Sequence, residues 1–321
     1  MELTFLTPLA ALFALAALVP LAVFLGRERH VRRIRASLRL AEPSRRSRLS
    51  VAVALVAVCA LLALAAAQPV VATTRVLPER TDAQVFVVLD TSRSMLASAK
   101  PGAPTRFERA RSLASALRDR LPEVPVGVAS ITDDLLPHLF PTTDRRVFVA
   151  TIEKSIEVER PPPSSLATVA TALEGLASAP RTNYFPPSTR HRVLVVFTDG
   201  ETRPHEFPSE FAGAFRKEPR VQTVFVRLWG ADERIYETGV AEVGYRPDPG
   251  GEADLGQIAS LVGGRVVSED DAGTLGRVVA DLLGTGPTID REHEGRRRAL
   301  MPWITLAVLL PLGFVLMRRN L

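Results

Sequence analysis

Two uncharged apolar segments near the N-terminus restrict most strongly what this chain can form. Leu3–Leu25 (LTFLTPLAALFALAALVPLAVFL) and Leu49–Ala67 (LSVAVALVAVCALLALAAA) contain no charged residue and no polar face. Each is long enough to cross a bilayer, which takes about 20 apolar residues in a helix. Leu300–Met317 is shorter and also uncharged, and Trp303 stands where an interfacial anchor is expected. We therefore expect three transmembrane helices, with buried core helices as the alternative.

The distribution of arginine predicts how these spans are oriented. The linker Gly26–Arg48 holds nine arginines against two glutamates, and the positive-inside rule places such a loop in the cytoplasm. The region Gln68–Ala299 is then extracytoplasmic, although Arg296–Arg298 on its outer side argue in the opposite direction. The first apolar segment lacks the basic residues that precede a signal peptide core, so we expect it to be retained. The linker arginines either contact anionic lipid or dock a partner.

Charge and cysteine content exclude other classes of protein. The chain has a formal net charge of +5, but the excess of basic residues lies in the linker and the C-terminal tail, outside Gln68–Ala299. Nothing in that distribution indicates nucleic-acid binding. The single cysteine, Cys59, lies in an apolar segment, so a disulfide framework is absent.

The region Gln68–Ala299 alternates solidly apolar strands with amphipathic helices. We predict strands at 85–89, 124–132, 192–200, 221–228 and 265–269. We predict helices at 105–121 with Thr105 as N-cap, at 147–157, from about Ser165, and at 209–216, 253–264 and 272–283. Residues 133–146 are rich in turn formers, and 230–251 resemble a surface insertion. The pattern predicts an α/β fold with a doubly wound, mostly parallel sheet, in which ligands bind beyond the carboxyl ends of the strands.

Oxygen-bearing side chains gather at two of these strand ends. In the stretch VFVVLDTSRSM, Asp90, Ser92 and Ser94 alternate, so one loop can turn all three toward a single point. Asp199 ends another apolar strand and can approach the same edge of the sheet. Taken singly, these residues are common helix caps and turn formers. Together, without a neighbouring His or Cys, they predict a site for Mg²⁺, Ca²⁺ or Mn²⁺ and disfavour zinc.

These two motifs resemble a known metal site. DTSRSM followed by VVFTDGE is similar to the metal-ion-dependent adhesion site of von Willebrand factor A domains, and the resemblance extends over Val85–Leu283. It implies that Asp90, Ser92, Ser94 and Asp199 hold a divalent cation, with the two serines as direct ligands and Asp90 binding directly or through water.

The middle threonine of the family's motif has no clear counterpart. The corresponding stretch is PPPSSLATVATAL, where Thr168 is the preferred metal ligand and Ser165 the second choice. Alignment on Leu173 alone would place Ala167 at that position. Arg93 fills a variable position of the first motif, and we expect its side chain to be solvated.

The order of the segments narrows the resemblance further. Two N-terminal apolar segments with a basic linker, a von Willebrand factor A domain and a C-terminal apolar segment resemble the Bat aerotolerance proteins of the bacterial inner membrane. The resemblance implies a scaffold or cofactor role in an envelope complex, with a MoxR-type AAA+ ATPase and other membrane proteins of this kind as partners. A stand-alone surface receptor that binds a protein or glycan is the alternative, and it would have no use for a basic linker beyond topology.

Enzymatic activity is not expected. Haloacid-dehalogenase phosphatases need a second aspartate two residues after the first, where this chain has Ser92. A serine hydrolase needs a nucleophile elbow, and Ser92 lies in no G-x-S-x-G sequence, although His138, His191 and His205 could serve as bases. A phosphate-binding Walker A sequence is also absent.

Overall fold

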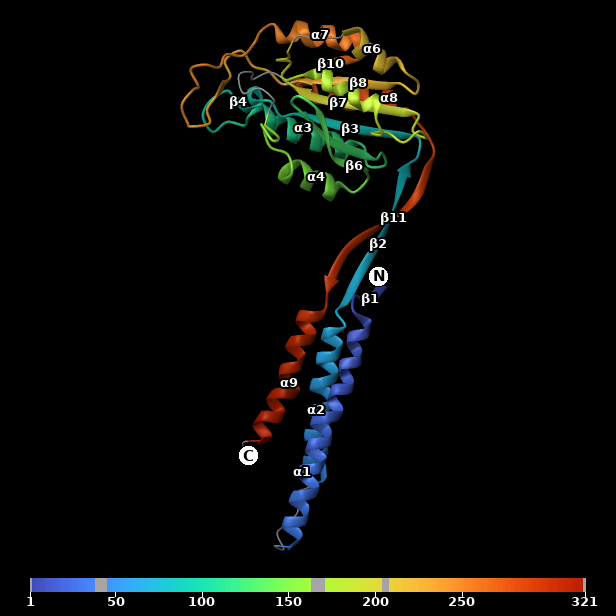
Figure 1. The fold of residues 1–321 in the computed structure, drawn as a ribbon, viewed down its shortest axis with the longest axis vertical. Coiled ribbons are helices and arrows are strands. Elements are labelled where there is room, and N and C mark those ends of the chain that lie inside the picture. The colour runs from blue at the N-terminus through green and yellow to red at the C-terminus, as the bar shows by residue number, and fades with distance from the viewer. Residues whose placement is uncertain (1, 38–44, 163–170, 204–207, 320–321) are drawn as a thin grey trace. The chain divides into compact units, whose positions relative to one another are not determined.

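The chain forms two compact units. The computed structural model describes residues 2–37, 45–162, 171–203 and 208–319 (Figure 1). The first unit comprises Met1–Val76 and Glu292–Leu321, and the second comprises Leu77–Arg291.

The first unit is built mainly from helices. Its elements are β1 (Glu2–Phe5), the 3-10 helix η1 (Pro8–Ala17), α1 (Leu18–Ser37), α2 (Arg45–Ala66) and α9 (Met301–Arg319). Within the unit, α2 lies beside both η1 and α9 (Figure 1). β1 pairs antiparallel with β2 (Pro69–Arg80), and β11 (Thr288–Ala299) is the third strand of that sheet.

The apolar segments expected to cross a membrane have different bounds in the structure. The first is divided among β1, η1 and α1. Pro8 is the first residue of η1, a position at which its missing N–H breaks no helical hydrogen bond. The second helix begins at Arg45 instead of Leu49, and the third extends to Arg319. In the part of the chain that the structure describes, no helix is at once long and apolar enough to span a membrane.

A six-stranded sheet forms the centre of the second unit. Its strands are β3 (Ala83–Asp90), β5 (Val126–Ile131), β6 (Leu135–Thr142), β7 (His191–Thr198), β8 (Val221–Arg227) and β10 (Arg265–Ser268). Their spatial order is β10-β8-β7-β3-β5-β6, and every neighbouring pair is parallel except β5 and β6. The prediction of a mostly parallel α/β sheet is confirmed.

Helices cover both faces of this sheet, and the side chains of each strand alternate between them. Val85, Val87 and Leu89 pack on the face covered by α3 (Arg106–Arg120), α4 (Arg145–Lys154) and α8 (Ala272–Leu283). Phe86 and Val88 face α6 (Pro208–Arg216), α7 (Gly251–Val262) and the 3-10 helix η3 (Leu173–Ala177), which the short α5 (Ser178–Arg181) follows. Because both faces are buried, the strands are apolar throughout, which made them recognisable.

Two local predictions differ from the structure. The turn-rich stretch 133–146 contains an edge strand, β6, and its prolines Pro137 and Pro141 are tolerated because an edge strand leaves N–H groups unpaired. The helix expected from about Ser165 begins in residues outside the described ranges, and the next described residues form only the short η3 and α5.

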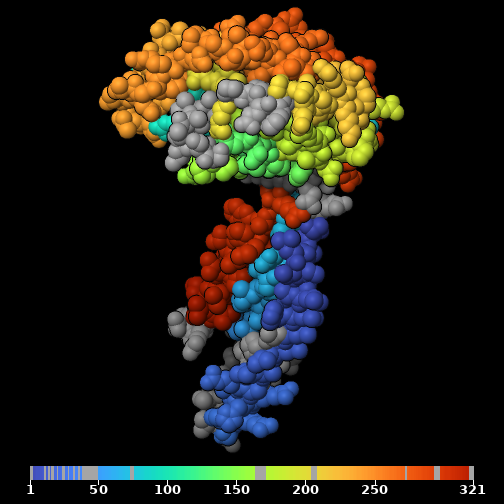
Figure 2. All heavy atoms as spheres, turned by 45° about the horizontal axis from the view of Figure 1, so that its top comes forward, coloured from blue at the N-terminus to red at the C-terminus, as the bar shows by residue number. Residues whose placement is uncertain are grey.

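The segment between β8 and α7 is more than a surface insertion. We refer to residues 229–250 as the 229–250 segment, and Figure 2 shows its orange atoms on the surface of the second unit. Its strand β9 (Arg234–Ile235) pairs antiparallel with β4 (Ala97–Ser98), which follows the 3-10 helix η2 (Arg93–Leu96). Ile235 and Tyr245 are buried against Ala97. The segment therefore packs on the loop that carries the predicted metal ligands.

Candidate metal centre

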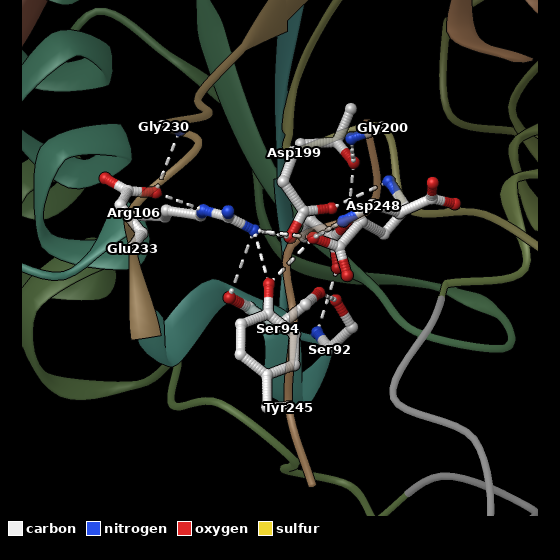
Figure 3. Close-up of polar contacts among 12 residues, drawn as sticks. Ser92, Ser94, Arg106, Asp199, Gly200, Gly230, Glu233, Tyr245 and Asp248 are labelled. Carbon is white, nitrogen blue, oxygen red and sulfur yellow. Dashed lines mark hydrogen bonds and ion pairs between the residues drawn. The ribbon is translucent and has the colours of Figure 1, made fainter. Parts of the chain in front are cut away.

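The predicted ligands meet at one edge of the central sheet. Asp90 is the last residue of β3, and Asp199 directly follows β7, the parallel neighbour of β3. Ser92 and Ser94 belong to the loop after β3, and Figure 3 shows both close to Asp199. All four residues are at most 1% exposed. Sequence reasoning thus identified four residues that the fold does bring together.

Three donors from the described part of the chain hold the carboxylate of Asp90. Its Oδ1 accepts hydrogen bonds from the Ser92 backbone N–H at 2.9 Å and from the Thr171 hydroxyl at 2.6 Å. Its Oδ2 accepts from the Thr198 hydroxyl at 2.7 Å. The Ser92 and Ser94 hydroxyl oxygens lie 3.0 Å apart. The site is therefore a preorganised group of oxygen atoms.

Burial and a second carboxylate disfavour the negative charge on Asp90. Complete removal from water, and then the nearby charge of Asp199, raise the pKa of Asp90 to about 7, although the bonds from Thr171 and Thr198 act in the opposite direction. Two buried carboxylates with this mutual repulsion form a site that a bound cation would stabilise.

Thr171 is the site residue that sequence reasoning missed. The expected ligand Thr168 and its alternative Ser165 lie outside the described residues. Thr171 is fully buried, and its backbone is held on both sides, by Thr171 N–H donating to the Glu201 carbonyl and by Arg203 N–H donating to the Thr171 carbonyl. The stretch SSLATVAT offers several hydroxyls at close spacing, so sequence alone could not select the one that reaches Asp90.

Arg106 is a second residue that the sequence did not point out. It is the first residue of α3, directly after the Thr105 N-cap, whose capping box with Glu108 is present as expected. Arg106 is completely buried, and its Nη1 donates to Asp199 Oδ2 at 2.8 Å, as Figure 3 shows. An arginine in the first turn opposes the helix dipole, and that mismatch is the signal from which a buried acidic partner could have been inferred.

Further acidic and phenolic groups surround this guanidinium. Arg106 Nη1 also donates to Glu201 Oε1 at 3.0 Å and to the Tyr245 hydroxyl oxygen at 2.9 Å, and its Nε donates to Glu233 Oε2 at 2.6 Å. Burial lowers the pKa of Arg106, but the attraction of Asp199 and its other partners outweighs that effect and raises it overall. Burial, followed by the charge of Asp199, raises the pKa of Glu201.

The charges within the site remain unbalanced toward the negative. Within the described part of the chain, four buried carboxylates (Asp90, Asp199, Glu201 and Glu233) face one fully buried guanidinium, that of Arg106. Arg109, which is partly exposed, reaches Glu233 at 2.7 Å and is also paired with Glu269. The surplus of negative charge favours uptake of a cation.

Arg93 is not the solvated side chain that we expected. It is 25% exposed and forms ion pairs with Glu159 at 3.1 Å, Glu237 at 3.0 Å and Glu242 at 3.1 Å. Burial lowers the pKa of Arg93, but the hydrogen bonds that it donates to Glu242 and Glu237 more than offset this effect and raise the pKa overall. The expectation failed because its three partners come from distant loops that only the fold brings to the rim of the site.

The donor set fits a hard divalent cation. Two carboxylates and the hydroxyls of Ser92, Ser94 and Thr171 are oxygen donors of the kind that Mg²⁺, Mn²⁺ and Ca²⁺ prefer. Among the residues that the structure describes, no group of three or more His, Cys, Asp or Glu side chains has a metal-binding arrangement. An ion here would therefore depend on the hydroxyls as much as on the carboxylates.

Comparison with known proteins identifies the fold of this unit. Residues 85–201 match the family model of the von Willebrand factor type A domain, so this part of the chain is similar to such domains. Domains of this family are in general binding modules that engage protein partners and do not catalyse reactions. No curated protein matches the chain at a significant level.

Several solved structures are similar to this chain. BatB from Bacteroides thetaiotaomicron is 23% identical over 62% of this chain and 98% of that chain, with a TM-score of 0.51. An aerotolerance-related membrane protein from Bacteroides fragilis is 24% identical over 63% and 98%, with a TM-score of 0.49. Proximal thread matrix protein 1 from the mussel byssus, with a zinc-occupied metal-ion-dependent adhesion motif, is 17% identical over 76% and 55%, with a TM-score of 0.42. At these identities the likeness to BatB concerns the fold alone.

Proposed function

We propose that the von Willebrand factor A domain of this chain binds a divalent cation and, through that ion, a protein partner. The ligands are Asp90, Ser92, Ser94 and Asp199, with Thr171 in the role expected of Thr168. The observation that supports the proposal is the convergence of these buried oxygen donors at the ends of β3 and β7. Mg²⁺ is the preferred ion, with Mn²⁺ or Ca²⁺ as alternatives.

The two buried carboxylates of the site favour a cation bound between them. Because Asp90 and Asp199 repel each other in a dry environment, a divalent cation between them would offset a cost that the metal-free protein bears. Magnesium keeps part of its water shell in most protein sites, and a carboxylate from a partner can replace one of those waters. The bound ion would thus present a positive charge that recognises an acidic residue.

The location and the assembly form the second part of the proposal. The three uncharged apolar segments anchor the chain in a bacterial inner membrane, and the nine arginines of the linker keep that linker in the cytoplasm. The domain then lies on the extracytoplasmic side. The resemblance of this layout to the Bat proteins supports a scaffold role in an envelope complex that works with a MoxR-type AAA+ ATPase and other membrane proteins carrying this domain.

Metal binding by the purified full-length chain tests the central claim. We would titrate Mn²⁺ by calorimetry and record thermal unfolding with EDTA, Mg²⁺ or Mn²⁺. Free ion at 100 times its dissociation constant stabilises the folded state by about 2.7 kcal/mol. We expect this stabilisation in the wild type and its loss in Asp90→Asn and Asp199→Asn. Asp119→Asn is the matched control, because the ion pair of Asp119 with Arg145 is exposed and involves no proposed metal ligand. A wild-type chain that neither binds Mn²⁺ nor responds to it would contradict the proposal.

A further inference from the structure

One buried guanidinium contacts both the metal site and the 229–250 segment. Arg106 donates from Nη1 to Asp199 Oδ2 and from Nε to Glu233 Oε2, at 2.8 and 2.6 Å. Its Nη1 also reaches the hydroxyl of Tyr245. Glu233 and Tyr245 belong to the 229–250 segment, and Figure 3 shows Arg106 lying between Glu233 and Asp199. A change at Asp199 is therefore two hydrogen bonds away from that segment.

Much of what holds the 229–250 segment in place is polar. Its buried apolar contact with the loop after β3 consists of Ala97, Ile235 and Tyr245, with partly buried Leu96 beside them. The segment is also attached by the two-residue pairing of β4 with β9 and by the partly exposed ion pairs of Arg93 with Glu237 and Glu242. Glu201 accepts from Tyr245 and Asp248 of the segment, and Arg109 donates to Glu233. A segment with so few apolar contacts opens at a low free-energy cost, so the loss of one buried ion pair can change its opening measurably.

A bound ion and Arg106 would compete for the same carboxylate. Both oxygens of Asp199 are already used, since Oδ1 accepts from Glu201 N–H at 2.9 Å and Oδ2 accepts from Arg106. Two cations that share one buried carboxylate repel each other, and little water is present to screen that repulsion.

The hydrogen bonds of the guanidinium are unevenly distributed. Nη1 serves Asp199, Glu201 and Tyr245, with the Ser94 carbonyl at 3.5 Å as a fourth acceptor. Nη2 is buried and has no acceptor among the residues that the structure describes. Nη1 thus has more acceptors than its two hydrogens can satisfy, whereas the hydrogens of Nη2 are unsatisfied. The guanidinium can therefore change its hydrogen bonds when one acceptor binds another group. Withdrawal of Asp199 by an ion would change how Arg106 holds its remaining partners.

We propose that Arg106 is a positioning residue that couples ion occupancy to the 229–250 segment. Arg106 donates to Asp199 and to the segment at the same time. An ion bound by Asp199 would therefore weaken the hydrogen bonds of Arg106 to Glu233 and Tyr245, and the segment would open more readily. By reciprocity, the guanidinium lowers the affinity of the site for the ion. This coupling rests on the proposed function, because it requires that Asp199 binds an ion.

Two readouts on the full-length chain test the coupling separately. Hydrogen–deuterium exchange of peptides within 229–250 reports the segment, and Mn²⁺ titration reports the site. In the wild type, saturating Mg²⁺ is expected to speed exchange of the segment at least threefold. In Arg106→Met, the segment is expected to exchange at least tenfold faster without any ion. The same variant should bind Mn²⁺ at least fivefold more tightly, because a repelling charge is gone.

Two further variants separate the coupling from a general loss of structure. Glu233→Gln removes the partner on the segment side but leaves Arg106 on Asp199, so the segment should loosen while Mn²⁺ binds no more tightly than in the wild type. Arg109→Met is the matched control, since Arg109 donates to Glu233 and Glu269 and to none of the proposed metal ligands in the described residues. Its Mn²⁺ affinity should stay within twofold of the wild type. If Arg106→Met fails to fold, Glu233→Gln still decides whether the segment depends on this ion pair.

The outcomes distinguish the two proposals. Absence of Mn²⁺ binding in the wild type would overturn the proposed function, and the coupling with it. Mn²⁺ binding that leaves exchange in 229–250 unchanged would overturn the coupling alone. Equal or weaker Mn²⁺ binding by a folded Arg106→Met variant would also overturn it, because the guanidinium would then serve only to support the structure.

Discussion

Replacement of Asp90 by asparagine should make the metal-free protein more stable at neutral pH while it removes the ion site. The reason is the charge on a carboxylate that is 0% exposed and adjacent to Asp199. A pKa raised from 3.8 to about 7 means that the folded state binds this proton more tightly than the unfolded state does. The stability that this proton provides is fully present below pH 4 and is lost as the pH rises through 7.

The magnitude follows from the difference between the two pKa values. Each pH unit between them lowers the free energy of unfolding by about 1.4 kcal/mol, so the whole effect is about 4 kcal/mol. Between pH 5 and pH 8 the wild type in EDTA should lose about 3 kcal/mol from this group. Asparagine is neutral and can still accept from Thr171 and the Ser92 backbone through its carbonyl oxygen. It therefore keeps two of the three hydrogen bonds without the charge.

Denaturant unfolding of both proteins in EDTA at several pH values measures this effect. The difference in the free energy of unfolding, Asp90→Asn minus wild type, should grow with pH and reach its maximum above pH 7. Other titrating groups, Glu201 among them, are present in both proteins and contribute mainly to the common trend. Parallel curves for the two proteins would refute the reasoning, because they would mean that Asp90 titrates alike in the folded and unfolded chain.

The remaining predictions concern the third hydroxyl and the turn after β7. Thr171→Ala should weaken Mn²⁺ binding about tenfold, as expected for loss of a buried hydrogen bond to a charged ligand, and Thr171→Ser should restore most of it in the same titration. Gly200→Ala should lower the melting temperature, because Gly200 has φ +86° and a Cβ there would lie 2.7 Å from the Gly251 carbonyl oxygen. Gly213→Ala, in α6 with nothing within 4 Å, is the control and should stabilise by about 0.5–1 kcal/mol.

The central sheet was predictable because its strands are covered on both faces. A strand buried on two sides must be apolar at nearly every position, so β3, β5, β7 and β8 were visible as continuous runs. The edge strand β6 has one exposed side and two prolines, and these are also the properties of a loop. Its strand conformation depends on the neighbouring β5, which local sequence cannot show.

The site was predictable to the extent that it lies at strand ends. Parallel strands end at the same edge of a sheet, so the order of the motifs alone places Asp90 and Asp199 near each other. The choice among the hydroxyls between Ser165 and Thr171 was different. It depends on how a loop is held against the turn after β7, where the Thr171 backbone bonds with Glu201 and Arg203.

The sequence by itself determined the α/β class and the strand ends that carry oxygen donors. These follow from local patterns of apolar and polar residues. Only the tertiary structure decided which charges face one another. Arg106 meets Asp199, Glu201 and Glu233 across sequence separations of 93, 95 and 127 residues. Ion pairing is strong only where folding removes both partners from water at short distance, and no local pattern in the chain specifies that distance.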